Sequence, residues 1–199
     1  MTTTPTPPPG SDAIPAEIDP DAPLWVFGYG SLLWNPEIDV AERAPALLQG
    51  WHRSFCMRSI HHRGSEAEPG LVLALDAGDG ASCEGLALRA RPGSEAEALA
   101  ALRARELISS AYVEKLVTLW LTDGRQVTAL AYVIDPAHGQ YCGGLPLEEQ
   151  ARIIARAVGG RGPNADYLFN TVEHLEALGV QDGELDWLAA RVRALVGAA

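Results

Sequence analysis

Glu106 is the acidic residue whose position in the sequence is best suited to chemistry. It follows Leu99 by seven residues and Leu102 by four, so on a helix its side chain lies on the same apolar stripe as the two leucines. Burial there favours the neutral carboxyl group and raises its pKa toward the range useful for proton transfer near neutral pH. Alternatively, the helix ends at Glu106 and the side chain emerges into water. The sequence leaves both interpretations open.

A second candidate is the loop Gly28-Tyr29-Gly30-Ser31-Leu32. It follows residues 24–27, a run of large and β-branched apolar side chains typical of a buried strand. The two glycines let the backbone turn sharply, so that bare amides and the Ser31 hydroxyl can face a carboxylate or an oxyanion. The alternative is a tight strand-end turn without a ligand. A nucleotide loop is not indicated, because the motif lacks both a Gly-Lys-Ser/Thr ending and a third glycine that enters a helix.

Tyrosines and arginines could complete such a site. A tyrosine places a hydroxyl group at the end of an apolar body and can orient a polar ligand, although each one alone could equally be a half-buried core residue. The candidates are Tyr112, Tyr141 and Tyr167. An arginine can bind an anion through bidentate hydrogen bonds or form a surface ion pair, and the arginines in question are Arg53, Arg58 and Arg63. The adjacent His61 and His62 are poorly spaced for a shared metal ion and are predicted to be loop residues.

No motif for covalent or metal-assisted chemistry accompanies these residues. The sequence contains no nucleophile elbow, no H-E-x-x-H and no aspartate-rich loop. A lone glutamate together with an amide-rich loop suits a reaction in which the substrate supplies its own nucleophile, while the enzyme moves protons and stabilises an oxyanion. We therefore expect neither a metal ion nor an organic cofactor.

Composition narrows the class of protein. The 199 residues, 47% of them hydrophobic, suffice for one substantial core, and the net charge of −11 argues against nucleic-acid binding. No apolar run approaches the roughly 20 residues of a membrane helix, and the N-terminus lacks a signal-peptide pattern, so no membrane role is expected. Cys56, Cys83 and Cys142 are odd in number and lack C-x-x-C spacing, which favours a reducing cytoplasm over a disulfide framework or a zinc site.

Strands dominate the predicted architecture. The expected strands span residues 24–27, 51–58, 71–75, 83–88, 112–121 and 126–134. Residues 76–80 and Asp123-Gly124 have the composition of hairpin turns, whereas 37–49 and 59–70 are predicted to connect strands. About six strands with close turns predict an α+β fold, a small mixed or antiparallel β-barrel flanked by helices.

Four helices are predicted around this barrel. They span residues 94–107, 147–158, 164–178 and 183–196. Ser94 with Glu97 three residues later forms a capping-box pattern, and Asn164 is predicted to cap the third helix. Residues 1–20, rich in Pro and Thr, are predicted to be a disordered tail, and residues 21–199 a single domain.

Taken together, these blocks resemble the ChaC-type γ-glutamylcyclotransferases, within the γ-glutamylcyclotransferase-like superfamily, from Trp25 to about Val196. The matching blocks are Val26-Phe27-Gly28-Tyr29-Gly30-Ser31-Leu32 with Trp34, Arg53-Ser54-Phe55, His62-Arg63-Gly64, Pro69-Gly70-Leu71, Arg105-Glu106 with Tyr112, and Gly162-Pro163-Asn164-Ala165-Asp166-Tyr167-Leu168. Several separate blocks in the same order make the resemblance specific.

The resemblance implies a small β-barrel flanked by helices. It also implies cleavage of glutathione into 5-oxoproline and Cys-Gly, without a metal ion or an organic cofactor. By motif, Glu106 matches the general acid/base, and the loop from Gly28 to Leu32 matches the segment that holds the γ-glutamyl group. Tyr112 and Tyr167 match tyrosines that line the pocket, and Arg53 matches a motif arginine assigned here to substrate binding.

Three functions are consistent with the sequence. The leading hypothesis is cleavage of glutathione by intramolecular aminolysis with Glu106 as general acid/base. The second keeps the chemistry but acts on another γ-glutamyl amide or peptide, and the third is a non-catalytic γ-glutamyl-binding protein. The expected partner is a small-molecule substrate, with no nucleic acid and no membrane. The expected state is a cytoplasmic monomer or weak dimer.

Overall fold

The structure is a computed structural model that describes Ile18 and residues 22–198. Apart from Ile18, the predicted tail of residues 1–20 lies outside the described residues. Within the described part of the chain, no helix is long and apolar enough to cross a membrane.

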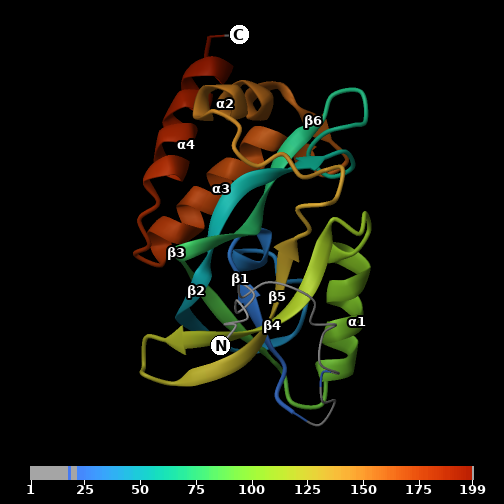
Figure 1. Cartoon of the computed structure of the whole chain (residues 1–199), viewed down its shortest axis with the longest axis vertical. Coiled ribbons are helices and arrows are strands. Elements are labelled where there is room, and N and C mark those ends of the chain that lie inside the picture. Colours follow the sequence, from blue (N-terminus) through green and yellow to red (C-terminus); the bar gives the residue numbers. More distant parts are fainter. Residues whose placement is uncertain (1–17, 19–21, 199) are drawn as a thin grey trace, which may run out of the picture.

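Five strands close into a barrel, in the order β1-β3-β2-β4-β5. They are Trp25–Gly28 (β1), Val40–Ser59 (β2), Gly70–Ala90 (β3), Tyr112–Leu121 (β4) and Gln126–Ile134 (β5). Strand β5 pairs in parallel with β1 and with β3, whereas the other pairs are antiparallel. The barrel is visible in the lower half of Figure 1. The predicted fold class, a small mixed barrel flanked by helices, is confirmed.

The long hairpin formed by β2 and β3 departs from the prediction. The predicted connection 37–49 is mostly strand, and the predicted strands 71–75 and 83–88 are parts of one continuous strand. The predicted turn 76–80 is therefore wrong, because β3 pairs with β2 on both sides of this segment. Gln49 pairs with Ser82 and Trp51 pairs with Ala77, so β3 has more residues between the two pairs than β2 has. The segment is therefore a bulge within a paired strand.

The hairpin formed by β4 and β5 agrees with the prediction. Its register runs from Tyr112 opposite Ile134 to Trp120 opposite Gln126. Gly124 has a φ of 89°, a left-handed conformation that favours glycine and that the Asp-Gly turn signal anticipated.

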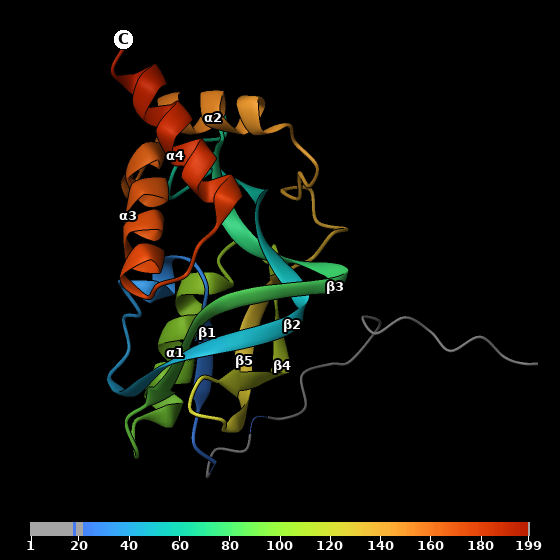
Figure 2. The same cartoon turned by 90° about the vertical axis from the view of Figure 1, so that its left-hand side faces the viewer.

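Four α-helices occupy the expected places. They are Glu95–Glu106 (α1), Leu147–Arg156 (α2), Asn164–Ala177 (α3) and Gly183–Val196 (α4). Helix α2 ends earlier than predicted because Val158–Gly159 (β6) pairs with Gly162–Pro163 (β7). Figures 1 and 2 show α2, α3 and α4 grouped at one end of the molecule, with α1 apart from them beside the barrel.

Both predicted side-chain caps are wrong. Ser94 precedes α1, but its hydroxyl group donates to the Arg91 carbonyl and caps no helical amide. Asn164 is completely buried as the first residue of α3. Its side chain accepts a hydrogen bond from the Leu71 amide at 2.6 Å and donates to the Leu71 carbonyl at 2.7 Å. The side chain thus joins α3 to β3 instead of capping the helix.

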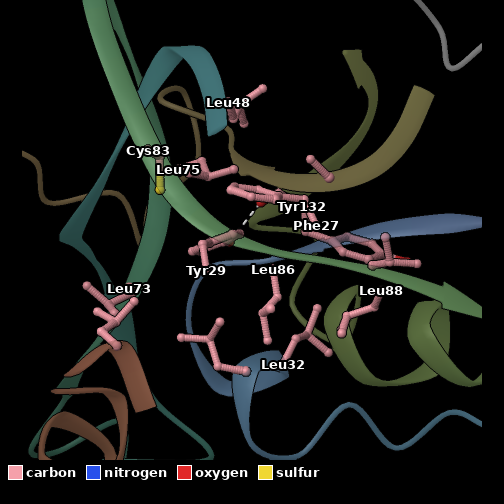
Figure 3. Close-up of a cluster of buried hydrophobic side chains, with 14 of the residues drawn as sticks. Phe27, Tyr29, Leu32, Leu48, Leu73, Leu75, Cys83, Leu86, Leu88 and Tyr132 are labelled. Carbon is pink, nitrogen blue, oxygen red and sulfur yellow. Dashed lines mark hydrogen bonds between the residues drawn. The ribbon is translucent and has the colours of Figure 1, made fainter. Parts of the chain in front are cut away.

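The barrel interior is filled by apolar side chains from all five strands, and Figure 3 shows part of this cluster. Phe27, Leu75 and Leu88 are fully buried there. Tyr29 lies in the same cluster, and its hydroxyl group donates to the Tyr132 carbonyl at 2.8 Å, the dashed line in Figure 3. The core therefore anchors the strand that leads into the Gly28–Leu32 loop.

Candidate active site

Two adjoining hollows lie where the Gly28–Leu32 loop meets the end of α1. The inner recess, of about 20 Å³, is lined by Tyr29, Gly30, Ser31, Leu32, Leu73, Glu106, Tyr112 and Tyr132. The outer cavity, of about 90 Å³, shares Ser31, Glu106 and Tyr112 with it and extends to the loop after β2. The structure thus brings together most of the residues that the family resemblance indicated. They are Glu106, Tyr112, Tyr167 and most of the glycine loop.

Glu106 is the last residue of α1, and its side chain is only 15% exposed. Burial raises the pKa of its carboxyl group, while the charges of Arg105 and Arg161 oppose that rise. Of the two sequence interpretations, the helix does end at this residue, yet the side chain lines both hollows instead of emerging into water. A carboxyl group in this setting is suited to exchanging protons at a pH above the ordinary range for glutamate.

The glycine loop leads directly into a 3-10 turn, Ser31–Leu33 (η1). The amides of Ser31 and Leu32 begin this turn, so neither has an acceptor within it. Gly30 is required for space, since a Cβ atom there would lie 2.9 Å from the Tyr167 hydroxyl oxygen. The loop thus presents backbone amides and the Ser31 hydroxyl group beside Glu106.

Arg105 is a site residue that the sequence identified only as the neighbour of Glu106. Its guanidinium group contacts Glu106 Oε1 at 3.0 Å and donates to Ser31 Oγ at 2.6 Å and to the Asn35 carbonyl. The side chain is 7% exposed. Arg105 therefore ties the end of α1 to the glycine loop, a contact that no spacing in the sequence could reveal.

Two tyrosines hold the backbone of one residue of β3. The Tyr112 hydroxyl group donates to the Leu73 carbonyl at 2.8 Å, and the Tyr167 hydroxyl oxygen accepts from the Leu73 amide at 3.3 Å. Burial raises the pKa of both hydroxyl groups, so both stay protonated. Tyr141 is elsewhere, since its hydroxyl group donates to Asp76 at 2.8 Å and the residue lines neither hollow.

The three candidate arginines have different positions. Arg53 lines neither hollow: it donates to the Tyr29 carbonyl at 3.0 Å and pairs with Asp182 at 3.1 Å, so it supports the glycine loop from behind. Arg58 is also absent from both linings. Arg63 lines the outer cavity, and its guanidinium carbon lies 5.7 Å from the centre of the Tyr167 ring. The structure therefore does not bring Arg53 to the site.

Three arginines and two histidines line the outer cavity. Arg63, Arg105 and Arg161 line it together with His61 and His62. Both histidines lie in the predicted loop, but the sequence did not assign them to the site. Burial, followed by the nearby charges of Arg161 and Arg105, lowers the pKa of His62. Among the residues that line the cavity, Glu106 is the sole carboxylate.

The arrangement defines a class of site. A small anionic ligand would be attracted by the arginines, and Glu106 would move protons at the junction of the two hollows. Within residues 22–198, no group of three His, Cys, Asp or Glu side chains could hold a metal ion. The residues of the two hollows are thus of the types that could bind a small anionic molecule and exchange a proton with it.

Comparison with known proteins identifies the family. The family model described as "ChaC-like protein" matches residues 24–195. A glutathione-specific γ-glutamylcyclotransferase of Escherichia coli is 39% identical over 176 residues, which cover 88% of this chain and 75% of the relative. A glutathione-specific γ-glutamylcyclotransferase 1 of Rattus norvegicus is 33% identical, with 96% and 90% covered. The chain belongs to the ChaC family.

Solved structures support the fold assignment. A crystal structure of a γ-glutamylcyclotransferase specific to glutathione, from yeast, superposes with a TM-score of 0.78 at 22% identity and covers 88% of this chain and 100% of that chain. A structure titled γ-glutamyl cyclotransferase superposes with a TM-score of 0.54 at 14% identity. These likenesses establish a shared barrel fold.

Proposed function

We propose that the protein cleaves glutathione into 5-oxoproline and Cys-Gly by intramolecular aminolysis. The bacterial and rat relatives, which are 39% and 33% identical to this chain, carry glutathione in their names. The observation that carries the proposal is Glu106, a buried carboxyl group with a raised pKa at the junction of two hollows.

The reaction moves two protons from the α-ammonium nitrogen to the departing nitrogen, and one carboxyl group can relay both. The Glu106 carboxylate accepts a proton from the α-ammonium group of the γ-glutamyl residue, and the resulting amine attacks the γ-carbonyl carbon. The new C–N bond closes the five-membered ring of 5-oxoproline. The Glu106 carboxyl group then returns this proton to the departing amide nitrogen as the old C–N bond breaks. The ring nitrogen still carries one proton more than the lactam, and it passes this proton through the Glu106 carboxylate to the freed amine, so that Cys-Gly leaves as its ammonium form. The atoms balance without an external nucleophile.

The glycine loop and the tyrosines would hold the γ-glutamyl group in the inner recess. The amides of Ser31 and Leu32 can stabilise the oxyanion that develops on the γ-carbonyl oxygen. Tyr112 and Tyr167 define the recess through their bonds to Leu73 and add no charge to it. A folded substrate, with amine and carbonyl held at about 3–3.5 Å, would gain much of its acceleration from this positioning.

The test replaces Glu106 by glutamine, which has nearly the same shape but cannot accept the proton. We expect the release of 5-oxoproline from glutathione to fall by roughly 10²- to 10⁴-fold, while calorimetry still detects glutathione binding. Glu149→Gln, at an exposed glutamate of α2, is the matched control and should retain wild-type turnover. Turnover of Glu106→Gln within a few-fold of wild type would refute the role of Glu106, and wild-type protein that releases no 5-oxoproline would refute the function.

The proposal extends to the form in which the protein works. We expect a single cytoplasmic domain, present as a monomer or weak dimer. The single-domain assignment is supported by one apolar cluster that runs from Leu24 in the barrel to Val192 in α4. The cytoplasmic assignment is supported by three cysteines that are all unbridged. Sedimentation velocity and cell fractionation would test these two expectations.

A further inference from the structure

Arg63 is held rigidly at the wall of the outer cavity. Its Nη1 atom donates to the Arg161 carbonyl at 2.7 Å and to the Pro163 carbonyl at 3.1 Å. Its own amide donates to Ser59 Oγ at 3.0 Å. The next residue, Gly64, packs so closely that a Cβ atom there would lie 2.0 Å from the Gly70 amide nitrogen. The backbone that carries Arg63 therefore has little room to move.

The charge of Arg63 has no carboxylate partner among the described residues. The other two arginines of the outer cavity do: Arg161 pairs with Glu37 at 3.4 Å, and Arg105 pairs with Glu37 and with Glu106. Arg63 is half-buried and is compensated by two backbone carbonyls and by the face of Tyr167.

The Arg63 guanidinium group is held in place and, within the described part of the chain, still has free N–H donors for a ligand. Burial lowers the pKa of Arg63, and the Arg161 charge lowers it further, whereas the Tyr167 and Asp166 side chains oppose the change. A guanidinium group has five N–H donors, and only those of Nη1 have acceptors among the described residues. The remaining N–H groups can bind a carboxylate with two parallel hydrogen bonds. Because the side chain is already held in place, little conformational entropy is lost on binding.

We propose that Arg63 binds the glycyl carboxylate of glutathione and thereby selects γ-glutamyl substrates that end in an anion. This inference rests on the proposed function. If the γ-glutamyl group occupies the inner recess and reacts at Glu106, the Cys-Gly part must extend into the outer cavity, because the two hollows meet at Glu106. Arg63 lines that cavity and is absent from the lining of the recess, so it faces the departing part of the substrate.

The experiment removes the charge from either side of this contact. The substrates are glutathione and its glycyl ethyl ester, which differ at the glycyl carboxylate. The enzymes are wild type, Arg63→Gln and Arg63→Lys, with Arg58→Gln as the matched control, because Arg58 is a nearby arginine that lines neither hollow. Release of 5-oxoproline gives kcat and KM, and thermal unfolding shows whether each variant is folded.

We expect esterification to raise the KM of the wild-type enzyme about 10- to 100-fold, the range for loss of a charge-assisted hydrogen-bonded pair, with a small change in kcat. Arg63→Gln should show a similarly raised KM for glutathione but almost no further effect of the ester. Arg63→Lys, which keeps the charge and loses the planar fork, should fall between them. Arg58→Gln should behave as wild type.

Other outcomes would overturn the inference. If wild type uses the ester as well as glutathione, the glycyl carboxylate is not bound by a cation, and this result does not depend on any variant folding. If Arg63→Gln loses activity equally toward both substrates, Arg63 acts on the γ-glutamyl end. In both cases 5-oxoproline is still released by wild type, so the proposed function would stand. Failure of the function itself would appear as no release from glutathione.

Discussion

Asn164 offers a quantitative test of how the site is supported. Its side chain makes two hydrogen bonds to the backbone of Leu71, and both residues are completely buried. In Asn164→Ala, the Leu71 amide and carbonyl lose these partners. Each unsatisfied buried group costs about 1–3 kcal/mol, so the free energy of unfolding should fall by roughly 2–6 kcal/mol. For a protein of this length that corresponds to a decrease in Tm of about 4–24 °C.

The loss should also reach the active site. Asn164 begins the helix that carries Tyr167, and Leu71 lies two residues before Leu73, whose backbone Tyr112 and Tyr167 hold. Loosening the join between α3 and β3 should therefore lower kcat/KM at temperatures where the variant is still folded.

Urea denaturation followed by circular dichroism measures the change, with an unchanged slope showing that the transition remains two-state. Asn170→Ala, on the same helix, is the matched control: the Asn170 side chain makes no hydrogen bond among the described residues, and alanine has the higher helix propensity. Its stability should equal or slightly exceed that of wild type. If Asn164→Ala loses less than about 1 kcal/mol, the reasoning from buried unsatisfied groups is wrong for this site.

Two further predictions concern Glu106 and Gly30. Because burial raises the Glu106 pKa, kcat should fall as the pH decreases through that raised value, above the pH of about 4.3 at which an ordinary glutamate titrates. The folded state holds this proton more tightly than the unfolded chain, so Glu106→Gln should be more stable than wild type at about pH 8 and not at about pH 3; an equal difference at both pH values would contradict this. Gly30→Ala places a Cβ atom 2.9 Å from the Tyr167 hydroxyl oxygen and should lower kcat/KM by roughly 5- to 150-fold, the equivalent of about 1–3 kcal/mol, through loss of the Tyr167 bond to Leu73. Gly183→Ala, where nothing lies within 4 Å, should leave kcat/KM unchanged, and equal kinetics for the two alanine variants would exclude the steric argument.

Short sequence patterns correctly predicted the helices and hairpins whose geometry depends on residues close to one another in the chain. The β4–β5 hairpin follows from Asp123-Gly124, whose glycine adopts the positive φ that its turn requires. The α4 helix follows from the helical spacing of Leu185, Leu188 and Val192, which are all buried on one face. In both cases the residues that decide the structure lie close to one another in the sequence.

Long-range pairing decided where local signals failed. The composition of residues 76–80 favours a turn, yet β2 pairs with β3 before and after this segment and keeps it within one strand. Asn164 is a good helix cap by residue type, but burial against β3 directs its amide group to the Leu71 backbone. A local preference worth about 1 kcal/mol yields to two buried hydrogen bonds that would otherwise be unsatisfied.

The residues of the site also differ in whether local sequence or long-range contacts determine their positions. The sequence by itself determined that Glu106 continues the spacing of an apolar helical stripe and that a glycine loop follows a buried strand, because helical periodicity and the space required by side chains are local properties. That the two lie together was decided by the tertiary structure. Only the tertiary structure decided which arginine faces the cavity: Arg53 is turned to Tyr29 and Asp182, whereas the loop after β2 brings Arg63 beside Tyr167. An arginine has the same charge and shape at every position of a sequence, so its type alone does not reveal its role. That role depends on which acceptors, distant in the sequence, the fold places around the guanidinium group.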